Sequence, residues 1–264
     1  MKRRKRGKQT LKRKMLSILL LCAMSCILAV VIVSYMTIRM IQNDSIQESM
    51  QIYLEQITRE IDSDYYDMIG IVNQMSPNGL IGSVTESYLS VEDNYDRYFE
   101  QKSLREELIK LGYVNTKLLG IAYYDPKEQK ELIGNFNVRV LDPSYQTISK
   151  VVVGAENIIQ AMHASYLGIR ETPVLSVMRR VSFGNKRVLD IYAEIEPDMS
   201  VSDRLNKEKW PYTYMEMDEN GIVQYSNNPV IVKGQKLLSE LPEKEGYAAI
   251  NQEGYKIMAY RSSI

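Results

Sequence analysis

Charged and aromatic side chains alternate along residues 187–195, a segment with the apolar alternation of a β-strand. Asp190, Tyr192 and Glu194 fall on one face of this strand, because successive side chains point to opposite faces. The other face is uniformly apolar and is expected to be buried; it carries Leu189, Ile191, Ala193 and Ile195. Carboxylates beside a phenol can hydrogen-bond a small polar molecule, so we take Asp190, Tyr192 and Glu194 as candidate ligand-binding residues. The alternatives are a solvated strand face and an ion pair within the protein.

Two further candidates lie on neighbouring predicted strands. Arg179 belongs to residues 173–183 and shares its side of that strand with four apolar residues, which are Leu175, Val177, Val181 and Phe183. Burying an unpaired cation costs several kcal/mol, so we expect a carboxylate of the protein or of a ligand beside Arg179. Tyr123 and Tyr124 point to opposite faces of residues 118–124, so one of them can line the same cavity, and we select Tyr123.

The sequence offers little for metal or nucleophilic chemistry. Its one histidine, His163, cannot supply a two-histidine metal site, and the two cysteines, Cys22 and Cys26, lie in an apolar run. No Gly-x-Ser-x-Gly, phosphate-binding glycine loop or zinc-protease motif occurs. We therefore expect no catalytic residues, no metal and no cofactor. His163 is expected to be a structural or surface residue within a short helix at residues 156–165.

Residues 15–38 predict a transmembrane helix. They carry no charge, and at about 1.5 Å per residue they reach about 36 Å, enough for a hydrocarbon core of about 30 Å. Residues 1–14 are rich in Lys and Arg and contain no acid. Since basic flanks stay inside, we expect a cytoplasmic N-terminus and an extracellular chain after about residue 39.

Two other interpretations of this apolar run compete with a transmembrane anchor. A cleavable signal peptide has a shorter apolar core and a small-residue cleavage site, and both features are missing here. A lipid-anchored cysteine at Cys22 or Cys26 is the second, but the residues around them match that signal poorly. An uncleaved anchor is the favoured interpretation.

The charge distribution limits the partners. The chain has 33 basic and 33 acidic residues, but nine of the basic residues precede residue 15, which leaves 24 against 33 in the rest. An acidic exterior disfavours nucleic acid, because phosphate binding needs clustered Lys and Arg. The basic N-terminus is expected to set the topology and to contact the lipid bilayer. With both cysteines in the apolar run, the exported part has no disulfide.

Apolar residues spaced by three or four predict one long helix over residues 43–75, continuous with the apolar run and ended by Ser-Pro-Asn-Gly. This helix is expected to be a stalk that can pair with a second copy of the chain. A second helix is predicted at residues 91–111. The predicted strands of the first sheet are 118–124, 131–140, 173–183 and 187–195, the last two joined by Gly-Asn. The fold class is therefore α+β, with helices on antiparallel strands.

A smaller unit is predicted to begin near residue 210. Its expected strands are 212–217, 222–225, 247–251 and 255–261, with a short helix near 235–241. The turn at residues 218–221 begins like a calcium-binding loop but lacks the later glutamate, so we interpret it as a hairpin turn.

This order of elements resembles the double Cache sensor domain, with two PAS-like sheets beside a long helix, and best matches the extracellular half of YesM-type sensor histidine kinases of Gram-positive bacteria. The segments that carry the resemblance are residues 15–38, residues 43–75, LLGIAYYDPKEQ, VLSVMRRVSFGN and YTYMEMDENGIVQYSNN. It implies a stalk helix with a membrane-distal subdomain over residues 39–209 and a membrane-proximal one over residues 210–264. It also matches Glu194 to a strand-end acid that contacts ligand in some family members.

The resemblance implies an extracytoplasmic ligand-sensing region of a two-component receptor that binds an unidentified small molecule and forms a homodimer through the stalk. The family continues with a last proximal strand, a second span and a kinase core, so we expect this chain to be a fragment or a truncated product without enzyme activity. Trp210 does not fall where the amino-acid-binding subgroup places its tryptophan, and amino-acid binding is not predicted.

Other functional classes stay open at this point. One is a membrane-anchored exported protein that acts as a binding or accessory factor. Another is the sensor region of a chemoreceptor or a cyclase, and an extracellular enzyme is the least favoured.

Overall fold

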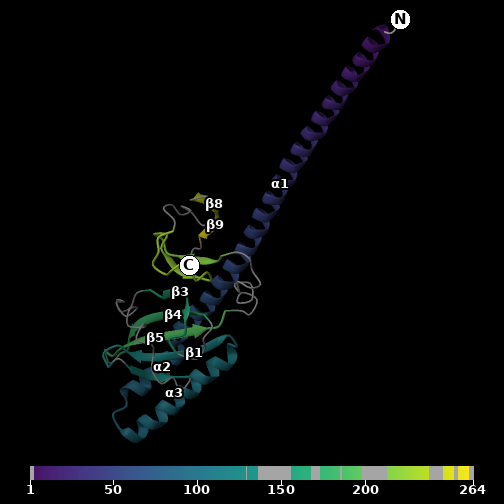
Figure 1. Ribbon diagram of the computed structural model, residues 1–264. Coiled ribbons are helices and arrows are strands. Elements are labelled where there is room, and N and C mark those ends of the chain that lie inside the picture. The colour runs from purple at the N-terminus through teal and green to yellow at the C-terminus, as the bar shows by residue number, and fades with distance from the viewer. Residues whose placement is uncertain are drawn as a thin grey trace. The chain divides into compact units, whose positions relative to one another are not determined.

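A computed structural model describes residues 3–128, 130–135, 156–167, 173–184, 186–197, 213–237, 246–252 and 255–261. Within these ranges the protein is α+β, with a long apolar N-terminal helix and antiparallel sheets (Figure 1). The chain divides into two compact units, Met1–Leu54 and Glu55–Ile264.

The first unit is the beginning of helix α1, Arg3–Met75. Of the described residues, this is the one helix long and apolar enough to span a membrane. Its apolar side chains between Met15 and Ile38 are exposed, as a lipid-facing helix requires. The predicted helix over residues 43–75 is confirmed, and it is continuous with the apolar run.

Helix α1 ends where the sequence predicts, at Met75 before Ser76 and Pro77. The chain then reverses tightly through Gly79, where a Cβ atom would lie 2.2 Å from the carbonyl oxygen of Gln74. A short helix that the sequence analysis missed, α2 (Leu80–Ser90), follows directly. Only glycine permits so close an approach between the two helices.

Helix α3 (Asn94–Val114) begins later than the predicted residue 91 because Asp93 caps it. The Asp93 carboxylate accepts hydrogen bonds from the backbone N–H groups of Tyr95, at 2.7 Å, and Asp96, at 3.3 Å. These are donors that a helix start leaves without intrahelical partners.

The main sheet has five antiparallel strands in the order β2-β1-β5-β4-β3. Their bounds are β1 Leu118–Asp125, β2 Lys130–Gly134, β3 Ile158–Ala164, β4 Pro173–Ser182 and β5 Val188–Ile195. Strands β1, β4 and β5 match the predicted ones closely. Of the predicted strand at residues 131–140, the part from residue 136 lies outside the described residues.

The predicted helix at residues 156–165 is wrong, because β3 occupies that position. Ile158 and Ile159 suit a strand, and β3 pairs with β4 from Ile158 opposite Met178 to Ala164 opposite Pro173. A bulge interrupts the register between Gln160 and His163. The spacing of apolar residues in this short segment fits a helix or a strand, and pairing with β4 decides in favour of the strand.

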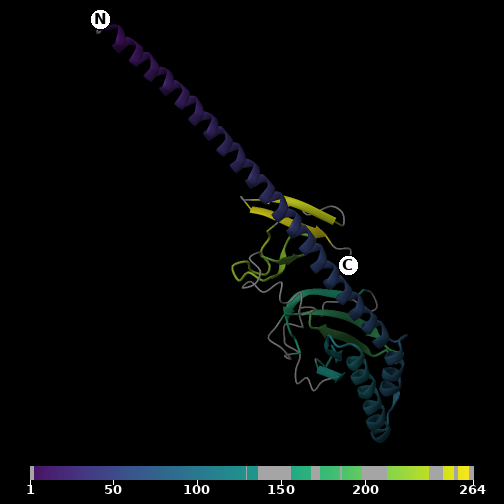
Figure 2. The same cartoon turned by 90° about the vertical axis from the view of Figure 1, so that its right-hand side faces the viewer.

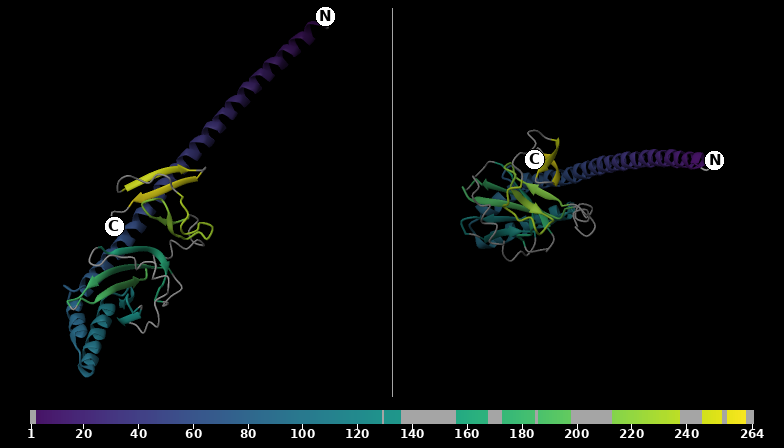
Figure 3. Two further views of the ribbon diagram at one scale, coloured as in Figure 1. Left: turned by 90° about the vertical axis from the view of Figure 1, so that its left-hand side faces the viewer. Right: turned by 45° about the horizontal axis from the view of Figure 1, so that its top comes forward.

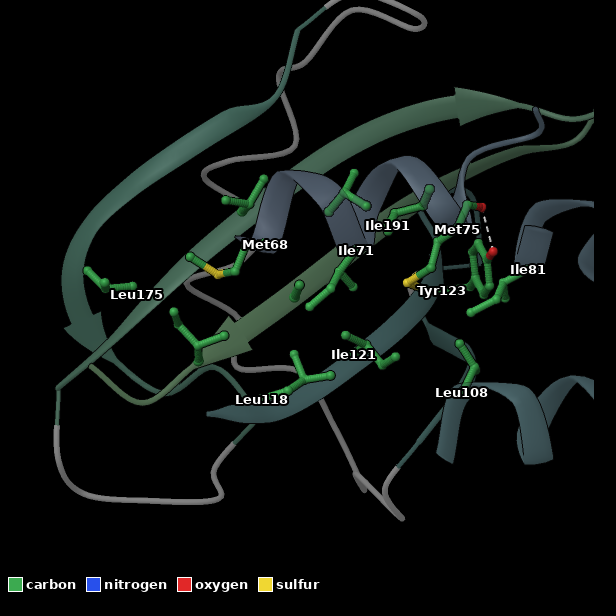
Figure 4. Packing of buried hydrophobic residues seen from close by; sticks show 14 of the residues in the cluster. Met68, Ile71, Met75, Ile81, Leu108, Leu118, Ile121, Tyr123, Leu175 and Ile191 are labelled. Atoms are coloured by element: carbon green, nitrogen blue, oxygen red, sulfur yellow. Dashed lines mark hydrogen bonds between the residues drawn. The ribbon is translucent and has the colours of Figure 1, made fainter. Parts of the chain in front are cut away.

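The last turns of α1 supply the core of the second unit. Figures 1 and 2 show these turns beside the main sheet, and Figure 4 shows their side chains packed on it. Met68, Val72 and Met75 are completely buried against apolar residues of β1, β4 and β5. The face of the sheet that these residues cover is called the helix face below.

Two separate hairpins follow the main sheet. The first pairs β6 (Met215–Met217) with β7 (Val223–Ser226). Gly221 closes its turn with a φ of 74°, and the Asp218 carboxylate accepts hydrogen bonds from the N–H groups of Asn220 and Ile222, at 2.9 and 3.1 Å. The predicted hairpin turn at residues 218–221 is therefore confirmed.

The second hairpin pairs β8 (Gly246–Gln252) with β9 (Tyr255–Arg261) and is drawn in yellow in Figure 3. The helix predicted near residues 235–241 is not formed at residues 235–237, where Lys236 instead makes an isolated β-bridge with Ile222. Residues 238–241 and the predicted domain boundary near residue 210 lie outside the described residues.

Replacing Leu104 by alanine is expected to lower the free energy of unfolding by about 2–5 kcal/mol, because the side chain is fully buried in the core. Urea denaturation of the full chain in detergent micelles measures the change. The matched control is Leu80→Ala, since Leu80 is 73% exposed. Equal losses in the two variants would contradict the packing described here.

Candidate functional site

The main sheet has a second face, opposite the helix face, which we call the outer face. Strand register defines it: Asp190 of β5 lies between Arg180 of β4 and Tyr124 of β1, and Tyr192 lies opposite Met178. Because side chains alternate along a strand, these residues share one side of the sheet. The outer face is the candidate ligand site.

The structure brings together three of the five predicted site residues. Asp190, Tyr192 and Glu194 lie on the outer face, whereas Tyr123 and Arg179 lie on the helix face. One cavity lined by all five is therefore not formed. A shift of one position along a strand exchanges the faces, so the neighbours Tyr124 and Arg180 take the outer positions.

Tyr123 holds the main sheet to the end of α1. Its hydroxyl donates a hydrogen bond of 2.5 Å to the carbonyl oxygen of Met75, the last residue of that helix (Figure 4). Burial raises the pKa of Tyr123 well above its usual value. Its hydroxyl satisfies a carbonyl that has no partner within the helix.

Arg179 also binds the end of α1 and not a carboxylate. Its Nη1 donates to the Asn73 side-chain oxygen at 2.7 Å and to the Ser76 hydroxyl at 3.4 Å. A cation at a helix C-terminus is stabilised by the negative end of the helix dipole. No carboxylate of the described residues pairs with Arg179, although one was expected. The negative end of the helix dipole supplies part of the stabilisation that a carboxylate would give.

Arg180 and Asp190 form a two-pronged ion pair directly across β4 and β5. The guanidinium donates to the two carboxylate oxygens at 2.6 and 2.8 Å. Asp190 is completely buried and Arg180 nearly so, which makes this the charge-assisted geometry that tolerates burial. Tyr124 lies beside Asp190, and burial, followed by the Asp190 and Asp125 charges, raises its pKa.

Glu194 accepts hydrogen bonds from the chain that follows β3. Its donors are the Ser165 hydroxyl at 2.6 Å, the Tyr166 N–H at 2.7 Å, the Leu167 N–H at 3.3 Å and the Tyr192 hydroxyl at 2.6 Å. Burial raises the pKa of Glu194, and these donors oppose that rise.

His163 is brought to the outer face by the bulge in β3. Its Nδ1 lies 2.7 Å from the Ala164 carbonyl, which can only accept, so Nδ1 carries a proton, and Nε2 lies 2.6 Å from the Ser176 hydroxyl oxygen. Its ring stacks on Tyr166 with centroids 4.2 Å apart. Burial lowers the pKa of His163, which favours this neutral ring. The structural role expected of His163 agrees with these contacts, although its predicted helix does not.

Aromatic and apolar side chains complete the outer face: Tyr124, Leu167, Met178 and Tyr192 form a buried cluster, with Ile158 and Tyr166 packed against it. Tyr166 was missed because no strand was predicted before it. Rings, hydroxyls and paired charges suit the binding of a small polar molecule, through stacking and hydrogen bonds. Among the described residues, no group of three or more His, Cys, Asp or Glu side chains could hold a metal ion.

No protein-family model matches the sequence. No curated protein matches it either. Among solved structures, the sensor domain of the histidine kinase DctB from V. cholerae is similar at 12% identity and a TM-score of 0.48, over 84% of this chain and 88% of that one. The ligand-binding domain of Mlp24 with asparagine is similar at 14% identity and a TM-score of 0.38, over 77% of this chain and 87% of that one. These values are too low to assign a fold, a ligand or an activity to this chain.

Replacing Asp190 by asparagine is expected to lower the free energy of unfolding by about 3–5 kcal/mol, because it removes the negative charge that compensates the nearly buried guanidinium of Arg180. Urea denaturation of the full chain measures the loss. Asp67→Asn makes the same change at an exposed position of α1 and should leave the denaturation midpoint unchanged. A small loss at Asp190, equal to that of the control, would mean that the pair does not hold β4 and β5 together.

Proposed function

We propose that this chain is the extracytoplasmic ligand-sensing region of a membrane-bound receptor of the two-component histidine kinase type. Residues 15–38 cross the bilayer, residues 1–14 stay in the cytoplasm, and the outer face binds a small molecule. The chain itself catalyses no reaction. Asp190, Tyr192 and Glu194 remain the proposed ligand-binding residues, now with Tyr124 in place of Tyr123 and without Arg179.

The observation that supports this proposal is the continuity of α1. The helix that contains the apolar run also supplies Met68, Val72 and Met75 to the core beneath the candidate site. A ligand on the outer face would act by favouring one packing of the sheet on α1 over another, to the extent that it binds the two differently. Pairing of two copies through α1 would carry that preference to a cytoplasmic module.

The polarity of the outer face supports binding over catalysis. Its buried charges are compensated, Asp190 by Arg180 and Glu194 by four donors, and His163 is neutral. A general acid, a general base or an activated nucleophile needs a reactive group that is aimed at a substrate. A membrane-anchored binding or accessory protein, or the sensor region of a chemoreceptor or cyclase, would use the same face, and only the output distinguishes them.

Chemical labelling tests the topology. In a background where both native cysteines are replaced by alanine, Ser87→Cys places a thiol at an exposed position of α2. A membrane-impermeant maleimide is expected to label it in intact cells, whereas Gln9→Cys should react only after permeabilisation. Labelling of Ser87→Cys only after permeabilisation would overturn an extracytoplasmic site.

A thermal-shift screen of the full chain in detergent micelles tests ligand binding. We expect a member of a panel of sugars, organic acids and amino acids to raise the melting temperature by several degrees, since ligand at 100 times Kd adds about 2.7 kcal/mol. Tyr124→Phe removes an outer-face hydroxyl and should reduce the shift, whereas Tyr66→Phe, at an exposed position of α1, should not. No stabilisation by any compound, or equal shifts in the two variants, would count against the site.

A further inference from the structure

Glu216 of β6 joins the first hairpin to the edge of the main sheet. Its Oε2 accepts a hydrogen bond of 2.8 Å from the backbone N–H of Met162 in β3, and its Oε1 accepts one of 3.1 Å from the Tyr214 hydroxyl. The bulge between Gln160 and His163 explains why the Met162 N–H is available, since a bulge leaves its extra residue out of the strand ladder. The Glu216 carboxylate thus accepts the hydrogen bond that a backbone carbonyl would accept from the Met162 N–H in a regular strand pair.

Helix α1 closes this junction from another side. Tyr65 of α1 is 6% exposed, and its hydroxyl donates a hydrogen bond of 2.6 Å to the carbonyl oxygen of Gln160, next to the bulge. On the hairpin, the ring centroids of Tyr214 and Tyr225 lie 6.3 Å apart. The half-buried Glu216 carboxyl group therefore lies between tyrosines of the hairpin and the backbone of β3.

Among the residues that the structure describes, this carboxylate has no cationic partner. Within the described ranges, no Lys, Arg or His forms an ion pair with Glu216. Helix α1 adds the acids Asp62 and Asp64 near Tyr65, and Lys117 is bound to Asp64. The titratable group that β3 contributes, His163, is bonded to Ala164 and Ser176.

We propose that the junction formed by Glu216, Tyr214, Met162 and Tyr65 is a proton-sensitive connection, which holds the β6–β7 hairpin to β3 more firmly when the Glu216 carboxyl group is protonated. A neutral carboxylic acid still accepts from Met162 and can donate to a tyrosine oxygen, so the contacts survive protonation. The charged form lies among tyrosines and has no ion-pair partner among the described residues, which costs free energy.

Glu216 changes its protonation state at a pH within the physiological range. Burial raises its pKa from 4.5 to about 7, while the hydrogen bonds from Met162 and Tyr214 oppose the rise. An acid with a raised folded-state pKa binds more protons when folded, so stability falls as the pH rises from about 4.5 to about 7 and stays low above that. This device needs no ligand on the outer face, although both use β3.

Hydrogen exchange measured by mass spectrometry on the full chain in detergent micelles tests the proposal. Protection factors, which correct for the intrinsic effect of pH, are expected to fall about tenfold at residues 215–226 between about pH 6 and pH 8. In Glu216→Gln, which is neutral at every pH, the protection should not change with pH. The matched control Glu219→Gln, at an exposed position of the same hairpin, should behave as the wild type.

A decline in Glu216→Gln as large as that of the wild type would overturn the proposal, as would a wild-type hairpin whose protection does not depend on pH. Tyr214→Phe provides a second test if Glu216→Gln does not fold. It removes one donor to the carboxylate, so the midpoint of the protection change should move to a higher pH. An unchanged midpoint in Tyr214→Phe would also contradict the proposed role of Glu216.

Discussion

The main sheet depends on one interface, the packing of the last turns of α1 against its helix face. Met68, Val72 and Met75 are completely buried there, and β5 contributes an unbroken set of apolar residues to the same core. Burial of one such side chain contributes about 1.5–3 kcal/mol. The sheet also binds the helix end itself, through Tyr123 and Arg179. The residues that hold the sheet on α1 are therefore unavailable to a ligand.

A central strand buried on both faces explains the chemistry of the outer face. Asp190, Tyr192 and Glu194 of β5 are all completely buried, so any charge among them needs internal partners. Asp190 has Arg180 across the strand pair, and Glu194 has four donors, three of them from the chain after β3. Such a connected polar network fixes the positions of its members. The outer face is therefore held in one arrangement by its own internal contacts.

The periodicity of apolar residues predicted where helices and strands lie along the chain better than it predicted which side chains contact one another. The spacing of three or four from residue 43 to Met75 and the alternation in β5 each have one structural interpretation over their length. The short segment of β3 fits a helix or a strand, and pairing with β4 decides between them. Alternation placed Arg179 correctly on the apolar side of β4. It could not reveal that the end of α1 lies there, because that contact joins residues far apart in sequence.

Strand β3 combines two roles because it is an edge of the main sheet. An unpaired edge exposes backbone groups, and here the bulge directs one of them, the Met162 N–H, to Glu216 of the hairpin. The same bulge turns His163 to the outer face, where it binds Ser176, and the chain just beyond β3 binds Glu194. The position of β3 is therefore set jointly by the outer-face network and by the Glu216 junction. Since the two sets of contacts share one short strand, a displacement that weakens one of them strains the other.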